Sequence, residues 1–537
     1  MLTTATLLTG LTPYTGTFDA AAAAHLLRRT TYGPTRDQIA QAVDQGLEAT
    51  LDALLEDLPL PEPPLSYAPN DPNVAVGDTW VNAPYADTTP QSYRPRIASL
   101  RAWSFGRYLD PAPNIREKLV FFWHNHFVTS EVADPKFVYR YFDTLRTHAL
   151  GNFRALTKAM TIDPAMLRYL NGNQNTKDAP NENYARELLE LFTVGKGPQI
   201  APGDYSNYTE DDVVAIARVL TGWRDRGFFT QNLNTQVEAF FRANQHDTGA
   251  KQLSYHFGNA TINNQGPDEY AALIDLLFEQ PAVATYLARK LYRYFVYYDV
   301  DASIEANVIA PLAQTLRDND YAIAPTLRTF LGSTQFFDAL NLGPMIKHPL
   351  EYLATILKTT NVALPPEQPF LPRYRVLYEL SELLEEVGMP FLSPPSVAGY
   401  PAYYQEPTYY RLWVNSATLP KYTQFVNLLL SPDGLELGNN ETVRIDVLTE
   451  VQALPDPSDI NALIDDLTAL HFPQPISDGQ RDYLKEQLIP GLPDFEWNVE
   501  YSEWAIDPDN PQLRAAIESK LRTLYTALLT MPEYYLS

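Results

Sequence analysis

The stretch Asn181-Glu182-Asn183-Tyr184-Ala185-Arg186-Glu187-Leu188-Leu189-Glu190-Leu191-Phe192 places four ionisable side chains inside an apolar helical pattern. At helical spacing the buried stripe consists of Tyr184, Leu188, Leu191 and Phe192. Glu187 and Glu190 stand one turn apart, and Arg186 can reach both Glu182 and Glu190. Charged side chains beside a core need partners or a function, so this predicted helix is also a candidate site.

A second predicted helix, Arg116-Glu117-Lys118-Leu119-Val120-Phe121-Phe122-Trp123-His124-Asn125-His126-Phe127, contains two of the eight histidines of the chain. On a regular helix His126 lies on the apolar face and should point inward, whereas His124 is turned about 200° away from it. The two rings therefore cannot face one point. A third histidine, His246, precedes Asp247 in a turn-like segment.

These motifs supply two overlapping sets of candidate residues. The nitrogen and oxygen donors suited to zinc, iron or manganese are His124, His126, Glu187, Glu190 and His246. The candidate catalytic residues are Glu187, Glu190, Arg186, His246 and Asp247. In a hydrolytic mechanism Arg186 holds one glutamate ionised, while the other is raised toward neutrality by burial and serves as acid or base. The alternative is structural, with His126 as a hydrogen-bonded core histidine and Arg186 bridging Glu182 and Glu190 in a buried network.

The loop before the first helix spaces oxygen ligands like a calcium-binding loop. Its candidate ligands are Asn171, Asn173, Asn175, Asp178 and Glu182, together with the Lys177 carbonyl at the seventh position of the template. Asn171 replaces the usual aspartate, Thr176 replaces the turn glycine, and Pro180 lies inside the loop. The alternative is an asparagine-rich turn that caps the following helix through its own side-chain hydrogen bonds.

Composition bounds the class of protein. The 537 residues exceed the usual size of a single core, so we expect two or three subdomains around a large helical body. The net charge of −25 argues against a nucleic-acid partner. The chain has no cysteine, which excludes disulfides and thiolate metal sites. No apolar run approaches the roughly 18 residues of a spanning helix, so we expect a soluble protein without a membrane span.

The chain is predicted to be mainly α-helical, with long proline-rich irregular arms and minor β-hairpin content. We divide it into an N-terminal helical unit (1–58), a proline-rich arm (59–96), a main helical body with the polar motifs (97–425) and an acidic C-terminal helical region (426–537). Thr35 with Gln38 and Thr209 with Asp212 have the spacing of helix caps. The fading periodicity between Gly222 and Gly258 suits a hairpin or an ordered loop. The N-terminus has no recognisable signal peptide, which places the protein in the cytoplasm by default.

Seven stretches give the chain a resemblance to the bacterial family called domain of unknown function 1800. They are HLLRRTTYGPT from His25, REKLVFFWHNHFVTS from Arg116, DPAMLRYLNGNQN from Asp163, PNENYARELLELFTVG from Pro180, YTEDDVVAIARVLTGW from Tyr208, HDTGAKQL from His246 and PPSVAGYPAYYQEPTYYRLWVNSATL from Pro394. The resemblance implies no assigned activity. Many members of the family begin with export signals, and their genes often neighbour genes for proteins resembling sulfatases and alkaline phosphatases.

Two functions from different classes follow. The first is a hydrolase-like enzyme that uses the Glu/His/Arg pocket with or without a divalent metal (Zn, Fe, Mn or Ca). The second is a non-enzymatic binding or scaffolding protein, whose buried charges are structural and which assembles with a sulfatase-like or phosphatase-like partner. An enzyme should place His126, Glu187, Glu190 and His246 around one cavity, whereas a scaffold should place them apart or in dry, fully paired networks. No GxSxG, Walker or Rossmann fingerprint is found.

Overall fold

The structure, a computed structural model, describes residues 10–438 and 441–537. It is mainly α-helical, and within these ranges its strands form four two-stranded antiparallel sheets. The predicted fold class is therefore confirmed. No single helix in the described ranges has the length and apolar character to cross a membrane, although one bent pair, Gly266–Leu277 with Pro281–Phe295, passes on length and composition alone. The N-terminal stretch 1–9, where we expect no signal peptide, lies outside the described residues.

The helices run along most of the chain and are joined by short or irregular segments. In the first half they are α1 (Ala20–Thr30), α2 (Arg36–Leu54), α3 (Pro90–Tyr108), α4 (Arg116–His126), α5 (Pro135–Thr147), α6 (Phe153–Thr161), α7 (Pro164–Tyr169), α8 (Asn183–Glu187), the π-helical η2 (Leu188–Phe192) and α9 (Glu210–Val219). In the second half they include α10 (Glu269–Leu277), α11 (Pro281–Phe295), α12 (Ala302–Ile304), α13 (Ala310–Asp318), α14 (Ile323–Leu331), α15 (Pro349–Thr359), α16 (Phe370–Glu386), α17 (Leu419–Leu430), α18 (Val447–Gln452), α19 (Ile460–His471), α20 (Asp478–Leu488), α21 (Phe495–Ile506) and α22 (Pro511–Thr530). The hairpins are β1 (Gln199–Ala201) with β2 (Asp204–Tyr205), β3 (Trp223–Arg226) with β4 (Glu238–Phe241), β5 (Lys251–Gln252) with β6 (Thr261–Ile262) and β7 (Leu435–Leu437) with β8 (Glu441–Val443).

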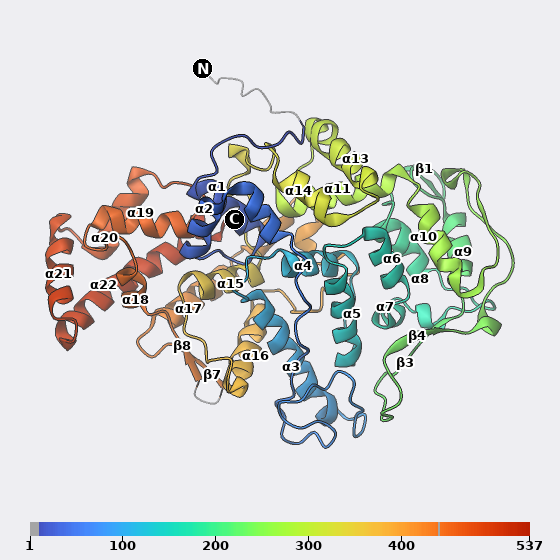
Figure 1. The fold of residues 1–537 in the computed structure, drawn as a ribbon, viewed down its shortest axis with the longest axis horizontal. Coiled ribbons are helices and arrows are strands. Elements are labelled where there is room, and N and C mark those ends of the chain that lie inside the picture. The colour runs from blue at the N-terminus through green and yellow to red at the C-terminus, as the bar shows by residue number, and fades with distance from the viewer. Residues whose placement is uncertain (1–9, 439–440) are drawn as a thin grey trace.

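Helix α4 lies at the centre of the molecule, with α5 to α10 on one side and α15 to α22 on the other (Figure 1). Nine of its eleven residues are buried, which is expected for a helix that is apolar on nearly all sides. Trp123 fixes its depth by donating its indole N–H to Ala149 O at 3.0 Å. Helix α1 lies beside the centre and buries His25, Arg28 and Arg29 (Figure 1).

The proline-rich arm is pinned to the body by buried aromatic and charged side chains. Trp80 and Tyr85 are buried, and the Trp80 indole donates to Ser99 Oγ at 2.9 Å. Arg96 donates to Ala83 O at 3.0 Å and pairs with Asp71. Helix α3 begins at Pro90, six residues before the predicted end of the arm, because proline suits the first turn of a helix.

The C-terminal helices α18 to α22 form one end of the molecule, and the chain then returns to its centre (Figure 1). Ser537 is buried, and its backbone N–H donates to Met345 O at 2.8 Å. The Ser537 hydroxyl also lies 3.0 Å from Arg29 Nη1 and 3.1 Å from Glu351 Oε1. The end of the chain therefore contacts α1 and α15.

Candidate functional site

A π-helical turn, η2 (Leu188–Phe192), forms the last five residues of the stretch from Asn181 to Phe192. Helix α8 ends at Glu187, and η2 continues it with one extra residue in the turn. The sequence predicts a regular helix here, so this is a difference from the prediction. It arises because carbonyl oxygens at the end of η2 bond to side chains of other helices: Phe192 O accepts from His126 Nε2 at 3.0 Å, and Leu191 O accepts from the Tyr286 hydroxyl at 3.0 Å. Turns of this kind occur often at functional sites.

His126 and Lys290 meet beside these carbonyls. Lys290 Nζ lies 3.1 Å from His126 Nδ1 and 3.3 Å from Leu191 O. Because a carbonyl only accepts, His126 carries its proton on Nε2 and offers a lone pair at Nδ1 to the lysine. Burial and the charge of Lys290 hold the pKa of the His126 imidazole well below its usual range. Burial, and next the charge of Arg293, lowers the pKa of Lys290 to about 7.

These residues line a cavity of about 710 Å³ between α4, residues 194–198, α11 and residues 398–406. The cations on its wall are Lys196, Arg289, Lys290 and Arg293. The aromatic residues on its wall are Phe122, Tyr286, Tyr294, Tyr403 and Tyr404. This volume falls in the range of pockets that take small molecules. We call this space the α4–α11 cavity.

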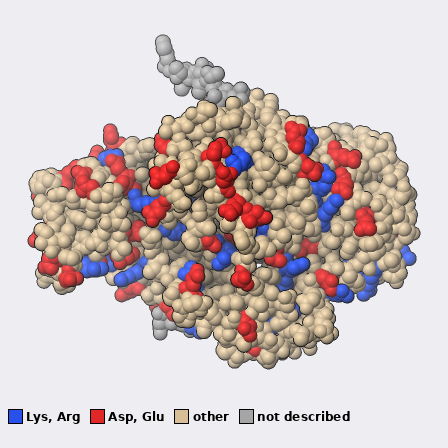
Figure 2. Space-filling view, viewed as in Figure 1, with Lys and Arg blue, Asp and Glu red and all other residues tan. Residues whose placement is uncertain are grey.

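The four cations of the cavity differ in how they are paired. Arg289 makes a bidentate pair with Glu305 at 2.6 and 2.8 Å, and Lys196 lies 3.2 Å from Glu190. Arg293 donates its Nε–H to Tyr298 O at 3.1 Å. Neither Lys290 nor Arg293 has a carboxylate oxygen within 4.0 Å in the described part of the chain. On the face of the molecule seen in Figure 2, by contrast, basic and acidic side chains are interspersed.

The carboxylate pair of η2 and α8 lies next to the cavity. Arg186 pairs with Glu210 at 2.8 Å and with Glu182 at 3.3 Å, so the expected Arg186 bridge to Glu190 is not formed. Glu190 instead accepts from the Tyr208 hydroxyl at 3.1 Å and pairs with Lys196. Burial and the nearby Glu190 raise the pKa of Glu187. Both groups thus have other partners: Glu210 and Glu182 hold the Arg186 guanidinium, and Tyr208 and Lys196 hold the Glu190 carboxylate.

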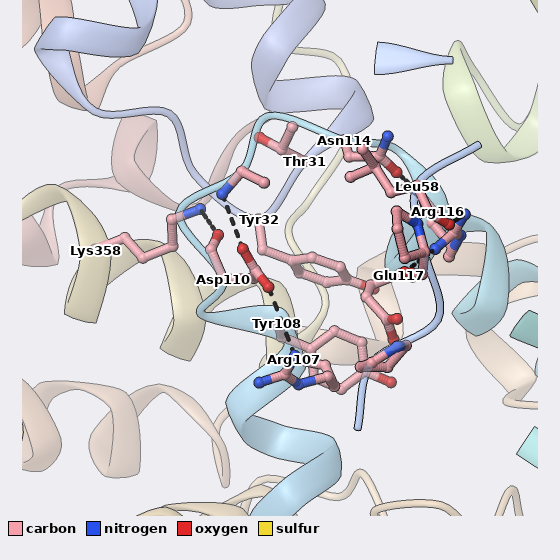
Figure 3. Close-up of a pocket in the computed structure, with 13 residues that line it drawn as sticks. Thr31, Tyr32, Leu58, Arg107, Tyr108, Asp110, Asn114, Arg116, Glu117 and Lys358 are labelled. Atoms are coloured by element: carbon pink, nitrogen blue, oxygen red, sulfur yellow. Dashed lines mark hydrogen bonds and ion pairs between the residues drawn. The ribbon is translucent and has the colours of Figure 1, made fainter. Parts of the chain in front are cut away.

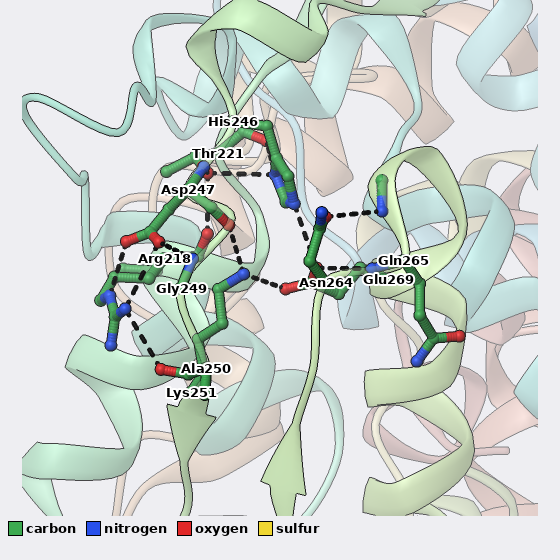
Figure 4. A network of polar contacts seen from close by, with 12 residues as sticks. Arg218, Thr221, His246, Asp247, Gly249, Ala250, Lys251, Asn264, Gln265 and Glu269 are labelled. Atoms are coloured by element: carbon green, nitrogen blue, oxygen red, sulfur yellow. Dashed lines mark hydrogen bonds and ion pairs between the residues drawn. The ribbon is translucent and has the colours of Figure 1, made fainter.

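His246 belongs to a separate, fully buried network (Figure 4). Its Nε2 lies 3.0 Å from Glu269 Oε2, and Lys251 Nζ lies 2.5 Å from the other oxygen of the same carboxylate. Asp247 makes a pair with Arg218 at 2.7 Å at the edge of the network. His246, Lys251 and Glu269 are each at most 3% exposed. These charges pair with one another and do not line the α4–α11 cavity.

His124 lies on the opposite side of α4 from His126. Its Nδ1 is 2.9 Å from the Tyr141 hydroxyl, which in turn donates to Phe127 O at 2.6 Å. Burial lowers the pKa of His124 to about 3. The residues proposed as a metal set are thus divided among three places, and no group of three or more His, Asp or Glu residues arranged to hold a metal ion occurs in 10–438 or 441–537. The residues present do not fit a shared transition-metal site.

The asparagine-rich loop is held by its own hydrogen bonds. Asn175 accepts from Asn181 N at 3.0 Å and donates to Ala217 O at 2.8 Å, so its amide is used in closing the loop. Asn173 donates to Asp225 Oδ1 at 2.7 Å. Glu182 is turned to Arg186, and the Asn171 side-chain oxygen accepts from Gln174 Nε2 at 3.4 Å.

A second, smaller pocket of about 170 Å³ lies beneath the 107–117 segment (Figure 3). Its charged side chains are largely paired: Arg116 contacts Asp57 at 2.6 Å, and Glu117 makes a bidentate pair with Arg146. Lys358 Nζ donates to Asp110 O at 3.3 Å. Because these groups bond within the protein, the pocket offers a ligand fewer free charges than the α4–α11 cavity does.

Lys290 and Arg293 were not among the site residues predicted from the sequence. Tyr286, Arg289, Lys290, Arg293 and Tyr294 have the 3- and 4-residue spacing of one helix face. This face of basic and aromatic residues in an otherwise apolar helix is the feature of the sequence from which the two site residues could have been predicted. The same pattern also fits a helix face exposed to solvent. Only the position of these residues opposite η2 in the structure shows that they line a cavity.

Fold and site together define a large, mainly α-helical protein with a cavity of about 710 Å³, whose lining includes four cations, several aromatic rings and the carboxylate of Glu406. Its π turn, His126 and the loop after it come from two of the stretches that carry the family resemblance. The chain belongs to the family described as protein of unknown function (DUF1800), whose model matches residues 25–536. Comparisons with curated proteins and with solved structures give no match.

Proposed function

We propose that the α4–α11 cavity binds a small anionic molecule. The observation that carries the proposal is the pair Lys290 and Arg293, which lie one turn apart on α11, line the cavity and have no carboxylate within 4.0 Å in the described ranges. Moving a cation from water into a protein costs free energy when no anion pairs with it. Binding of an anion beside Lys290 and Arg293 is favoured because it supplies that pairing. A guanidinium binds a carboxylate or a phosphate with two parallel hydrogen bonds.

The walls of the cavity support a ligand with a planar or apolar part. Tyr286, Tyr294 and Tyr403 present aromatic surface, and burial raises the pKa of each of these phenols, so they remain neutral. Aromatic rings favour stacking with a flat group. The ligand class is therefore an organic anion rather than a bare inorganic ion.

Hydrolysis of the bound anion is a second candidate function. It is favoured by Glu187, whose raised pKa suits an acid or base, and by the electrostatic influence of Glu190 and Glu187 on Tyr286 in the cavity wall. In this version of the hydrolase proposal His246 and Asp247 have a structural role.

The binding proposal is tested by titrating the protein calorimetrically with benzenesulfonate, an aromatic anion whose charge does not change near neutral pH. We expect Arg293→Gln to weaken binding by about ten- to a hundredfold, because one charged hydrogen-bonded contact contributes about 1.5–3 kcal/mol. Arg242→Gln removes an exposed cation outside the cavity and should leave the affinity unchanged. Equal affinity in the wild type and in Arg293→Gln, or no binding to either, contradicts the proposal.

A further inference from the structure

The amine of Lys290 is held in a defined direction. Its two hydrogen-bonding neighbours, His126 Nδ1 at 3.1 Å and Leu191 O at 3.3 Å, both act as acceptors. A lysine nitrogen has four tetrahedral positions, of which one is the bond to Cε. With two N–H groups committed to these acceptors, one position is left. It carries a third hydrogen in the ammonium form and a lone pair in the neutral amine, and Lys290 lines the α4–α11 cavity.

Building on the anion site proposed above, we propose that Lys290 is a nucleophilic amine that forms an imine with an aldehyde or ketone group of the bound anion. Arg293 lies one helical turn away on the same wall of the cavity. It would hold the anionic group so that a carbonyl carbon a few bonds away reaches Nζ. The ligand class is thus an organic anion that also carries a reactive carbonyl.

The surroundings of Lys290 favour the neutral amine that this reaction needs. With its pKa lowered to about 7, Lys290 is about half neutral at pH 7, whereas an ordinary lysine is neutral in about one molecule in several thousand. Two buried lysines have different partners. Lys118 Nζ lies 3.1 Å and Lys251 Nζ lies 2.5 Å from a glutamate oxygen, whereas Lys290 has no carboxylate oxygen within 4.0 Å in the described ranges. Lysines that act as nucleophiles are typically those whose charged form is disfavoured.

The reaction balances without a further reagent. The ammonium first loses a proton to solvent, and the Nζ lone pair adds to the carbonyl carbon, forming a C–N bond while the oxygen takes up a proton from solvent. Nζ then gives a second proton to solvent and the hydroxyl takes one up, so that the nitrogen lone pair expels water as the C–O bond breaks. The product is a protonated imine, so the net change is ammonium plus carbonyl to iminium plus water, with no oxidation or reduction. In the neutral amine, the hydrogen bonds to His126 Nδ1 and Leu191 O orient Nζ and leave its lone pair free to attack.

The test uses pyridoxal 5′-phosphate, which combines an aromatic ring, a phosphate and an aldehyde. The full-length protein is incubated with limiting probe, reduced with borohydride to convert any imine to a stable secondary amine, and mapped by peptide mass spectrometry. We expect Lys290 to be labelled at least about a hundredfold faster than the exposed Lys177, given the difference in neutral fraction. Arg293→Gln should slow labelling of Lys290 about tenfold or more, and Lys177→Met should not change it.

A charge-preserving variant separates nucleophilicity from binding. Lys290→Arg keeps a cation in the cavity and cannot form an imine, so it should lose the label at this position, and its benzenesulfonate affinity is measured in parallel. Pyridoxine 5′-phosphate, which has an alcohol in place of the aldehyde, reports non-covalent binding through displacement of benzenesulfonate. If it binds and Lys290 is labelled no faster than Lys177, the imine proposal is overturned and the anion site stands. If neither it nor benzenesulfonate binds, both proposals are overturned.

Discussion

Lys290 Nζ lies 3.1 Å from His126 Nδ1, and the two residues are 164 positions apart in the chain. The contact joins the histidine of α4 to the basic face of α11 at the point where the π turn ends. The His126 imidazole and the Lys290 amine both have a lowered pKa, and burial is the main cause in each case. This pairing has a consequence for stability as well as for binding.

The stability of the protein should depend on pH through Lys290. Its pKa is about 7 in the folded chain against an ordinary value of 10.5, so between these values the unfolded chain binds more protons and the free energy of unfolding rises with pH. Lys290→Met removes this dependence. Its thermal midpoint relative to the wild type should therefore be highest below pH 7 and fall as the pH approaches 10. A difference that is constant over this range would contradict the lowered pKa, and Lys177→Met serves as the exposed control.

Glu187→Gln should stabilise the protein at neutral pH. Burial and Glu190 raise the pKa of Glu187, so the folded chain holds this proton more tightly than the unfolded chain does, and stability is lost as the pH rises through the folded pKa. Glutamine lacks the charge. Thermal melts should show a higher midpoint for the variant at pH 7 and no difference once the wild-type carboxyl is protonated in acid. Glu279→Gln, at an exposed position, should show no such pH-dependent gain.

The buried network of Figure 4 should be essential for stability and irrelevant to anion binding. Glu269→Gln leaves the Lys251 charge buried without a carboxylate, at a cost of about 3–5 kcal/mol. Adding Lys251→Met removes the stranded charge and should recover most of the loss. Denaturant midpoints of the two single variants and the double variant measure this coupling. Additive losses of stability would contradict the coupling of Glu269 and Lys251. Weaker benzenesulfonate binding by the folded double variant would contradict the expectation that the network has no role in anion binding.

Gly399→Ala should disturb the wall of the α4–α11 cavity. Gly399 has φ +98°, and an added Cβ would lie 2.9 Å from the backbone oxygen of Asn125, whose side chain accepts from Tyr400 N. We expect a loss of about 1–3 kcal/mol in stability and weaker anion binding. The matched control is Gly479→Ala in α20, where a Cβ meets nothing within 4 Å and stability should rise by about 0.5–1 kcal/mol. Unchanged melting and binding for Gly399→Ala would rule out this role.

Asn173→Ala should weaken the asparagine-rich loop independently of calcium. The side chain donates to Asp225 at 2.7 Å, and a hydrogen bond to a charged group contributes about 1.5–3 kcal/mol. Thermal melts with millimolar calcium and with chelator should show the same loss in both, and Asn234→Ala, at an exposed position, should show none. A midpoint that calcium raises in the wild type and not in Asn173→Ala would instead support the calcium-loop prediction.

Local signals in the sequence predicted much of the secondary structure. The capping boxes of Thr35 with Gln38 and Thr209 with Asp212 open α2 and α9 as expected, because both partners lie within one turn. The hairpin of β3 and β4 falls in the region where helical periodicity fades. The π turn was not predicted, because the side chains that bond to its carbonyl oxygens, His126 and Tyr286, come from α4 and α11.

The candidate site was only partly accessible from the sequence. His126 was singled out, and it lines the α4–α11 cavity. In the sequence, Lys290 and Arg293 have the pattern of the polar face of an ordinary helix. Sequence spacing shows which residues share a face, but it does not show which other segments that face contacts. Conversely, His246 was predicted to belong to the shared Glu/His/Arg pocket. Its ring is instead paired with Glu269, which lies 23 positions later in α10 and was not predicted to be part of a site.

The sequence by itself determined the mainly α-helical class, the family and the positions of helix caps, because periodicity and capping depend on residues a few positions apart. Only the tertiary structure decided which charges are paired and which face a cavity. Whether a buried cation is neutralised depends on carboxylates from distant segments: Glu269 neutralises Lys251, whereas Lys290 meets an imidazole and a carbonyl. That difference in partners, set by packing, separates a structural charge from a candidate functional one.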